Sequence, residues 1–295
     1  MSNTTTTEPL RQTRITRVNA GTGGRLKQRL VTAALAVTLA GCVSVQTTKP
    51  GAIGLDRKQR MSTFVSAADM EKGSAAAYAQ VLGQANKEGA LNTNAALTQR
   101  VRAIADRLIP TVGVFRADAR AWDWQVNVIN SDQLNAWAMP GGKIAFYSGI
   151  INQLELTDAQ IAAIMGHEIA HALREHSRER ASSETNKSLV IGILGAATGV
   201  GATTQALADL AYQTTVGLPN SRLHETESDR MGVELMARAG YNPRAAIEVW
   251  QKMAKASSGK GGPEFMSTHP SNETRINDLT NYARIVDPLY QKAKR

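Results

Sequence analysis

The chain has 295 residues, of which 42% are hydrophobic, 20% charged and 5% aromatic, and its formal net charge is +9. This length and composition are those of a globular protein with a sizeable core, and abundant Ala and Gly favour packed helices over a sandwich or barrel. Residues 1–41 contribute +5 of the charge, which leaves +4 on residues 42–295. That remainder is too small to indicate a nucleic-acid-binding surface, so nucleic acid is not expected as a partner.

The N-terminus has the pattern of a secretory signal. Residues 25–29 (RLKQR) are basic and precede the apolar run 30–40, which is too short to span a bilayer and leads into Leu-Ala-Gly-Cys42. These four residues resemble the bacterial lipobox, in which cleavage leaves a lipidated cysteine as the first residue. We expect residues 1–41 to be a lipoprotein signal peptide with an N-terminal extension, and Cys42, the only cysteine, to be the lipidation site. The alternative is a free core cysteine behind a chance apolar run.

The residues after this cysteine bear on location and domain organisation. In enterobacterial lipoproteins an Asp directly after the cysteine favours inner-membrane retention, so Val43 implies lipid anchoring in the outer membrane, facing the periplasm. Residues 42–55 are polar and contain Gly and Pro, as expected of a lipidated tether. Residues 56–295 are expected to form one folded domain.

Helices and short strands are expected in the first half of this domain. Residues 56–91, rich in Ala, Gln and Lys, are expected to be helical. Asn94 can cap a second helix, whose apolar positions recur every three or four residues. Three strands are expected next, from alternating residues at 124–128 and from residues 136–139 and 143–148, which flank Pro140-Gly141-Gly142.

The second half is expected to be helical. Thr157 and Gln160 form a capping box at the start of a helix with an apolar face. Residues 188–202 are apolar and Gly-rich, but at about 15 residues they are shorter than the ~20 of a membrane span. We expect them to form a buried helix, with a membrane-touching element as the alternative. The remaining expected elements are a helix over 221–239 ended by Gly240, a helix beginning at Asn242-Pro243, a loop over 257–263 and a helix from Ser271 through Leu279.

The sequence His167-Glu168-Ile169-Ala170-His171 places two imidazoles one helical turn apart. Four residues rotate about 400°, so the two rings lie about 40° apart around the axis and can bind one metal ion. Glu168 lies about 100° from His167 and can reach a metal-bound water without being a ligand. An exposed helix that carries His and Glu by chance is the alternative for the motif by itself.

A catalytic zinc ion takes three protein ligands and keeps one position open. Arg174 and Ser177 stand where an extended zincin motif would need a Gly and a third His. His176 is about 140° from His171 around a continuous helix, so it is expected to be structural or exposed to solvent.

The segment His224-Glu225-Thr226-Glu227-Ser228-Asp229 offers the third ligand. A carboxylate would complete a His2Glu zinc site. Spacing favours Glu225 only modestly over Glu227, and His224 also competes. Asp229, one turn after Glu225, can accept a hydrogen bond from a zinc histidine and fix its tautomer.

Four ordered motifs resemble those of the zinc endopeptidase family that includes HtpX, the CAAX prenyl proteases, LoiP and BepA. They are residues 135–142 (NAWAMPGG), residues 167–171, residues 225–229, and Thr268-His269-Pro270 with Arg275, which together span about 140 residues. The family pattern Glu-x-x-Ala-Asp implies that Glu225 is the ligand and Asp229 the supporting carboxylate. Ser228 replaces the usual Ala, a small departure.

The resemblance also implies a fold and roles for other residues. It implies a gluzincin-type α+β domain, mainly α, with a short β-sheet beside the helix of the HExxH motif, and one Zn²⁺ per chain. It implies that His269 and Arg275 approach the substrate and stabilise the oxyanion; His269 could instead regulate the enzyme by occupying the open zinc position. It implies that an edge strand binds substrate by strand addition, whereas the alternative is an interior strand. The residues of that strand are Asn135, Ala136, Trp137, Ala138 and Met139.

Together these expectations describe a zinc-dependent endopeptidase of the bacterial cell envelope that hydrolyses unfolded or misassembled envelope proteins. Glu168 would take a proton from the zinc-bound water and pass it to the leaving amine. The alternative is a periplasmic chaperone-like assembly factor that binds outer-membrane proteins and in which zinc is structural. The residues after the last motif are too few for the helical repeats of BepA-like proteins, so compact lipoproteins such as LoiP are the expected nearest likeness.

Overall fold

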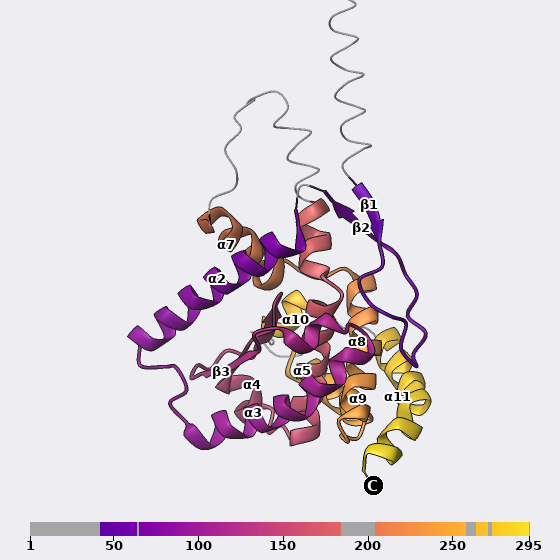
Figure 1. Cartoon of the computed structure of the whole chain (residues 1–295). Coiled ribbons are helices and arrows are strands. Elements are labelled where there is room, and N and C mark those ends of the chain that lie inside the picture. The colour runs from indigo at the N-terminus through magenta and orange to yellow at the C-terminus, as the bar shows by residue number, and fades with distance from the viewer. Residues whose placement is uncertain (1–41, 64, 184–203, 258–263, 271–272, 295) are drawn as a thin grey trace, which may run out of the picture. The chain divides into compact units, whose positions relative to one another are not determined.

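The computed structural model describes residues 42–63, 65–183, 204–257, 264–270 and 273–294. The predictions for the signal peptide, the apolar segment 188–202, the loop over 257–263 beyond its first residue, and the cap at Ser271 lie outside the described residues. Helices make up most of the described part and surround one three-stranded sheet (Figure 1), so the predicted mainly α, α+β fold is confirmed. No described helix is both long enough and apolar enough to cross a membrane.

The N-terminal segment packs on the helical body. β1 (Cys42–Val45) pairs antiparallel with β2 (Gln59–Ser62). Between these strands, Ile53 is buried in the core and the backbone N–H of Lys49 donates to the carbonyl of Phe115 at 2.8 Å. The residues predicted to be a tether therefore contact the folded domain.

The first long helix is shorter than predicted. α2 (Ala67–Lys87) begins after Ser66, whose side chain and backbone form a capping box with Asp69. Residues 59–62 lie inside the helix predicted over 56–91, but they form β2 because they pair with a strand. Strand pairing depends on contacts outside the local sequence, which composition does not reveal.

The three predicted strands are confirmed and form a mixed sheet. β5 (Lys143–Tyr147) lies in the middle, parallel to β3 (Gln125–Ile129) and antiparallel to β4 (Ala136–Met139). The chain turns between β4 and β5 at Gly141 and Gly142, whose φ angles are +78° and +82°. Residues other than glycine rarely adopt these backbone angles, so the two glycines fix this turn.

Two helices cross at the centre of the core. α5 (Asp158–Leu173) and α8 (Arg222–Arg238) approach at Gly166 and Gly232, where a Cβ on Gly232 would lie 2.9 Å from the backbone nitrogen of His167. This close approach holds α8 against the middle of α5. α5 also packs against β4, which places the sheet beside this helix as predicted.

The other described elements extend the helical body. Three of them correspond to predicted helices, namely those expected after Asn94, from Asn242-Pro243 and from Ser271, and residues 176–183 are also helical. They are α3 (Ala95–Leu108), η1 (Ile109–Val114), η2 (Asp118–Ala121), α4 (Ser148–Gln153), α7 (Thr204–Tyr212), the π-helical η3 (Gln213–Gly217), α9 (Ala245–Ser257), α10 (Glu264–Thr268) and α11 (Glu273–Ala293).

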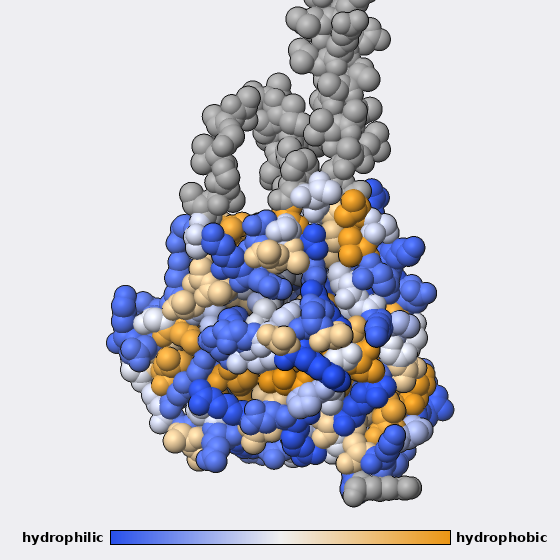
Figure 2. Space-filling model, viewed as in Figure 1, coloured by the Kyte–Doolittle hydropathy of each residue, from blue (hydrophilic) through white to orange (hydrophobic). Residues whose placement is uncertain are grey.

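Several helix ends agree with the local signals. The side chain of Asn94 caps α3, and Thr157 and Gln160 form the predicted capping box of α5. Gly240 follows α8 with φ +76°. α11 runs past Leu279 to Ala293, because apolar side chains such as Val286 continue to pack on the core. Hydrophilic residues cover much of the face in Figure 2, while the large apolar side chains of this core are buried.

Candidate active site

α5 carries three of the predicted site residues into the core. The capping box at its N-terminus fixes where the helix begins, and the spacing of four residues then places His167 and His171 on one side. The side chains of His167, Glu168 and His171 are all buried. The rings of the two histidines meet edge to face, with their centroids 4.7 Å apart.

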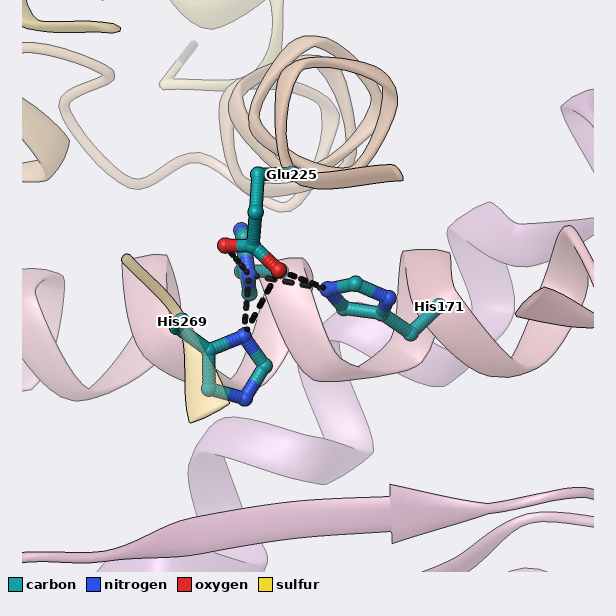
Figure 3. A group of neighbouring side chains, drawn as sticks. His171, Glu225 and His269 are labelled. Carbon is teal, nitrogen blue, oxygen red and sulfur yellow. Dashed lines mark hydrogen bonds and ion pairs between the residues drawn. The ribbon is translucent and has the colours of Figure 1, made fainter. Parts of the chain in front are cut away.

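Two further residues join these histidines from other elements. Glu225 comes from the first turn of α8 and His269 follows α10, and Figure 3 shows the carboxylate of Glu225 between the rings of His171 and His269. The Nε2 atoms of His167 and His171 are 3.1 Å apart, and His269 Nδ1 lies 3.2 Å from His167 Nε2. Glu225 Oε1 lies 3.3 Å from His171 Nε2 and 3.0 Å from His269 Nδ1. One ligand atom from each of these four residues lies within 4.8 Å of the others.

Hydrogen bonds at the other ring atoms indicate where the protons are. His167 Nδ1 lies 3.0 Å from Asp229 Oδ1, and because a carboxylate can only accept, this nitrogen carries a proton; in the neutral ring that a metal requires, Nε2 then has the lone pair. His269 Nδ1 lies 3.0 Å from Glu225 Oε1, which can only accept, and 3.3 Å from Asn220 Nδ2, which can donate, so these two neighbours require opposite roles of this nitrogen. A cation at this point would replace the shared protons and accept lone pairs from all four residues.

A cation is the group that such an arrangement accepts. Zinc forms bonds of about 2.0–2.1 Å to His nitrogen and carboxylate oxygen, so neighbouring ligand atoms of a tetrahedral site lie about 3.3–3.4 Å apart. The contacts among the four residues span 3.0–3.4 Å. The residues of this chain fit a zinc ion in both donor chemistry and spacing.

The competing ligands of α8 lie outside this group. Glu227 accepts hydrogen bonds from Arg174, and His224 Nε2 contacts Glu179 Oε2 at 3.1 Å. Only Glu225, of the three residues left open by spacing, faces His167 and His171.

Arg275 holds the acidic residues of the site. Its Nε and Nη2 atoms donate to the two oxygens of Asp229 at 2.7 and 2.8 Å, and Nη1 lies 2.8 Å from Glu225 Oε2. Burial by itself would raise the pKa of Asp229, but Arg275 and His167 outweigh it and lower that pKa. The predicted contact of Arg275 with an oxyanion stays a prediction, since every guanidinium nitrogen already has a partner, including the carbonyl of Pro270.

Glu168 lies beside the group of four rather than within it. Its Oε1 atom lies 3.4 Å from His269 Nε2, and the backbone of Ala138 in β4 hydrogen-bonds to the carboxylate. Burial raises the pKa of Glu168, and the nearby imidazoles only partly offset this effect. A carboxylate with a raised pKa is suited to accept a proton near neutral pH.

β4 lies at an edge of the three-stranded sheet rather than in its interior. Its four side chains are buried, and Val216 of η3 packs against the cluster that includes Trp137 and Met139. Asn135, just before the strand, is also buried. Substrate binding by this strand stays a prediction.

Two residues beside the site, His176 and Arg180, were not assigned to it from the sequence. His176 lies 2.9 Å from His171 through their Nδ1 atoms, although a continuous helix would have turned it away. The helix is not continuous, because α5 ends at Leu173 and Glu175 has φ +53°. Arg180 Nη1 donates to the carbonyl of Leu218 at 3.0 Å.

Arg180 brings a positive charge toward the site. Burial lowers the pKa of Arg180 to about 10, although Glu225 and Glu168 lie near enough to oppose this shift. Its Nε atom has no hydrogen-bond partner among the described residues. Nothing in the local sequence distinguishes Arg180 from its charged neighbours Arg178 and Glu179.

Comparison with known proteins identifies relatives of this chain. The model of peptidase family M48 matches residues 95–283, which include every residue of the candidate site. Mitochondrial metalloendopeptidase OMA1 of Saccharomyces cerevisiae is 33% identical over 177 residues, which cover 58% of this chain and 50% of the relative. OMA1 of Schizosaccharomyces pombe is 32% identical over 160 residues, covering 54% of this chain and 46% of the relative.

A second group of relatives has a different name. The beta-barrel assembly-enhancing protease of Escherichia coli K12 is 27% identical over 201 residues, covering 65% of this chain and 40% of the relative. The matches thus span half or less of the length of these curated relatives.

Proposed function

The chain belongs to peptidase family M48 and has the metalloendopeptidase domain of that family, and we propose that it is a zinc-dependent endopeptidase of the bacterial cell envelope. Its proposed substrates are polypeptides, namely unfolded or misassembled envelope proteins. The observation that carries the proposal is the convergence of His167, His171 and Glu225, with the carboxylate of Glu168 beside them. One Zn²⁺ per chain would be held by the three converging residues.

The proposed mechanism assigns the proton transfers to Glu168. When bound, zinc lowers the pKa of a coordinated water toward ~7 and polarises the scissile carbonyl. Glu168 takes the proton of the attacking water and passes it to the leaving amine. Asp229 keeps the proton of His167 on Nδ1, so that Nε2 stays available.

His269 has two roles consistent with the family resemblance. As an oxyanion group, together with Arg275, it would donate to the negative charge of the tetrahedral intermediate. In the geometry described above, its Nδ1 atom instead lies among the proposed ligands, 3.2 Å from His167 Nε2. We propose that this is a closed arrangement, which His269 must leave before a substrate carbonyl can enter.

β4 is proposed as the substrate-binding strand. Its position at the sheet edge and its hydrogen bond from Ala138 to Glu168 support this role. Strand addition uses backbone hydrogen bonds and tolerates many sequences, which suits unfolded chains as substrates.

The proposed localisation rests on the N-terminal residues. Residues 1–41 are proposed as the signal peptide, Cys42 as the lipidated residue and residues 56–295 as the catalytic domain. The beta-barrel assembly-enhancing proteases support an envelope role by their name, whereas the OMA1 relatives are named as mitochondrial. The outer membrane is favoured by Val43 alone.

A second candidate is a chaperone-like assembly factor that binds outer-membrane proteins. His269 favours it, because four protein ligands around one zinc ion are typical of structural sites, whereas catalytic sites keep one position open. This candidate predicts a function that does not depend on Glu168.

Degradation of casein, an unstructured protein, by the purified full-length chain tests the proposal. We expect zinc-loaded wild type to cleave casein and Glu168→Gln to be slower by about 10²–10⁴-fold, because the general base is lost. Both proteins should bind zinc equally, since Glu168 is not a proposed ligand. Equal cleavage by both would contradict the role of Glu168, and binding of casein by both without cleavage would favour the assembly factor.

A further inference from the structure

A second group of buried and half-buried polar residues lies on the far side of His171. Its members come from the segment before β2, from the turn after α5, from helix 176–183 and from α8, and they are joined by hydrogen bonds and ion pairs. We refer to it as the His176 network, which consists of Arg57, Arg174, His176, Glu179, His224 and Glu227.

His176 connects a proposed zinc ligand to a carboxylate. Its Nδ1 atom lies 2.9 Å from His171 Nδ1, and its Nε2 atom lies 3.0 Å from Glu227 Oε2. The rings of His171 and His176 meet edge to face with their centroids 4.9 Å apart. His176 is fully buried, so no water competes for these contacts.

The direction of these hydrogen bonds follows from the acceptor at the end. A carboxylate accepts, so His176 Nε2 carries a proton and donates a hydrogen bond to Glu227. The neutral ring of His176 then has its lone pair on Nδ1, which accepts the Nδ1–H of His171. His171 is thereby left with its lone pair on Nε2, the atom that faces His167 and Glu225.

Two arginines hold the carboxylate of Glu227 in place. Arg174 donates to its Oε2 atom from Nε at 3.1 Å and from Nη2 at 3.0 Å, and Arg57 Nη2 donates at 3.0 Å. Arg57 precedes β2, so a residue of the N-terminal segment helps to hold the carboxylate that is linked to His171 of α5.

The same network does not suit a second metal ion. His176, Glu179 and His224 lie within 4.8 Å of one another. Both oxygens of Glu179, however, accept hydrogen bonds from Arg57, at 2.7 and 2.8 Å. The charges of Arg57 and Arg174 already balance those of Glu179 and Glu227, so a divalent cation would be uncompensated.

His171 and His167 are both connected to a carboxylate, but the connection from His171 passes through one additional residue, His176. Asp229, held by Arg275, accepts directly from His167, whereas Glu227, held by Arg57 and Arg174, is reached from His171 through His176. We propose that His176 is a positioning residue that, with Glu227, fixes the tautomer and ring orientation of the zinc ligand His171. This inference rests on the proposed function, since it takes His171 as a ligand.

Ser228 is a further polar neighbour of His176. Its Oγ atom lies 3.4 Å from His176 Nδ1 and can donate to the same lone pair. The family usually has Ala here, so Ser228→Ala should leave zinc affinity nearly unchanged.

Zinc affinity of the full-length chain, measured by competition with a chromogenic chelator, tests this role without any cleavage assay. We expect His176→Leu to bind zinc about 10–100-fold more weakly, the usual cost of removing a hydrogen-bond partner of a metal ligand. The matched control is His224→Leu, because His224 is buried and stacked on His176, with centroids 4.2 Å apart, but contacts no proposed ligand. Its affinity should equal that of wild type.

Cobalt binding and a conservative variant distinguish a positioning role of His176 from a general loss of stability of the chain. The visible absorption bands of the Co²⁺-loaded chain report ligand geometry, and we expect them to change in His176→Leu but not in His224→Leu. His176→Gln can accept from His171 and donate to Glu227 through its amide, so it should recover most of the affinity. Wild-type affinity and spectrum in His176→Leu, or equal losses in both Leu variants, would overturn the proposal.

A measurement on the wild type covers the case in which His176→Leu does not fold. Long-range ¹⁵N–¹H NMR spectra of the zinc-loaded chain identify the protonated nitrogen of each ring. We expect His171 to be protonated at Nδ1 and His176 at Nε2; a proton on His176 Nδ1 would overturn the proposal. Absence of zinc binding by wild type would instead contradict the proposed function itself.

Discussion

Glu225, Glu227 and Asp229 alternate along α8, and each is buried against a different set of positive or proton-donating groups. Glu225 faces His171 and His269, Asp229 is bound by Arg275, and Glu227 is bound by Arg174. Burying a carboxylate is costly unless a partner compensates its charge. The tasks of these residues are therefore set by the cation or imidazole that each one meets.

A single substitution distinguishes the two proposed roles of His269, which are occupation of the fourth zinc position and stabilisation of the oxyanion. Four protein donors leave no open position at the proposed zinc site. We expect His269→Ala to cleave casein several-fold faster than wild type, because the fourth position becomes available to water and substrate. Initial rates at equal zinc content measure this effect. A rate at least ~100-fold lower than wild type would instead assign His269 to the oxyanion.

The crossing of α5 and α8 decides how the site residues of two helices meet. Gly166 and Gly232 lie at this crossing, and the backbone of His167 is the nearest obstacle to a side chain on Gly232. The approach of the two helices brings Glu225 and Asp229, from one end of α8, to His167 of α5. Small residues here have the same effect as in any close helix pair, where they let two backbones come together.

Gly232→Ala tests this packing. Its Cβ would lie 2.9 Å from the nitrogen of His167, so the helices must separate. We expect a loss of about 1–3 kcal/mol in the free energy of unfolding, as for other overpacked cores, together with weaker zinc binding. Urea unfolding and chelator competition provide the two measurements.

Gly83→Ala in α2 is the matched control. A Cβ at this position would meet nothing within 4 Å. Replacing an exposed helical glycine should stabilise the chain by about 0.5–1 kcal/mol without affecting zinc binding. Equal effects of the two substitutions would show that the α5–α8 crossing tolerates a side chain.

At the scale of the whole molecule, the site draws together segments that lie far apart in the sequence. Arg57 comes from the N-terminal segment, His167 and His171 from α5, Glu225 from α8 and His269 from the residues after α10. Metal binding to such a site can occur only in the folded state, because unfolding separates its ligands. Zinc should therefore stabilise the whole fold.

Removal of zinc should lower the thermal midpoint. At free zinc 1,000 times the Kd, binding contributes about 4 kcal/mol, which corresponds to roughly 8–16 °C for a domain of this size at about 2–4 °C per kcal/mol. Calorimetry with and without a chelator measures the shift. His171→Ala, which lacks a proposed ligand, should show little change on chelation; a shift as large as that of wild type would place the stabilising metal elsewhere.

The local sequence determined those features that depend on near neighbours. The capping box at Thr157, the one-turn spacing of His167 and His171, and the glycine that ends α8 are all set by hydrogen bonds and dihedral angles within a few residues. The motif resemblance then indicated Glu225 and Asp229 as partners of this helix. For these reasons the mainly helical fold and most of the candidate site could be predicted.

The tertiary structure decided what depends on contacts between distant segments. A continuous helix would place His176 about 140° from His171, and it was expected to be structural or exposed to solvent, but the break at Glu175 brings it to that residue. β2 replaces part of a predicted helix because β1 pairs with it. Hydrogen bonds from Arg57 to Glu227 join residues 170 positions apart. Such long-range pairs leave no local periodicity, so only the packed fold reveals them.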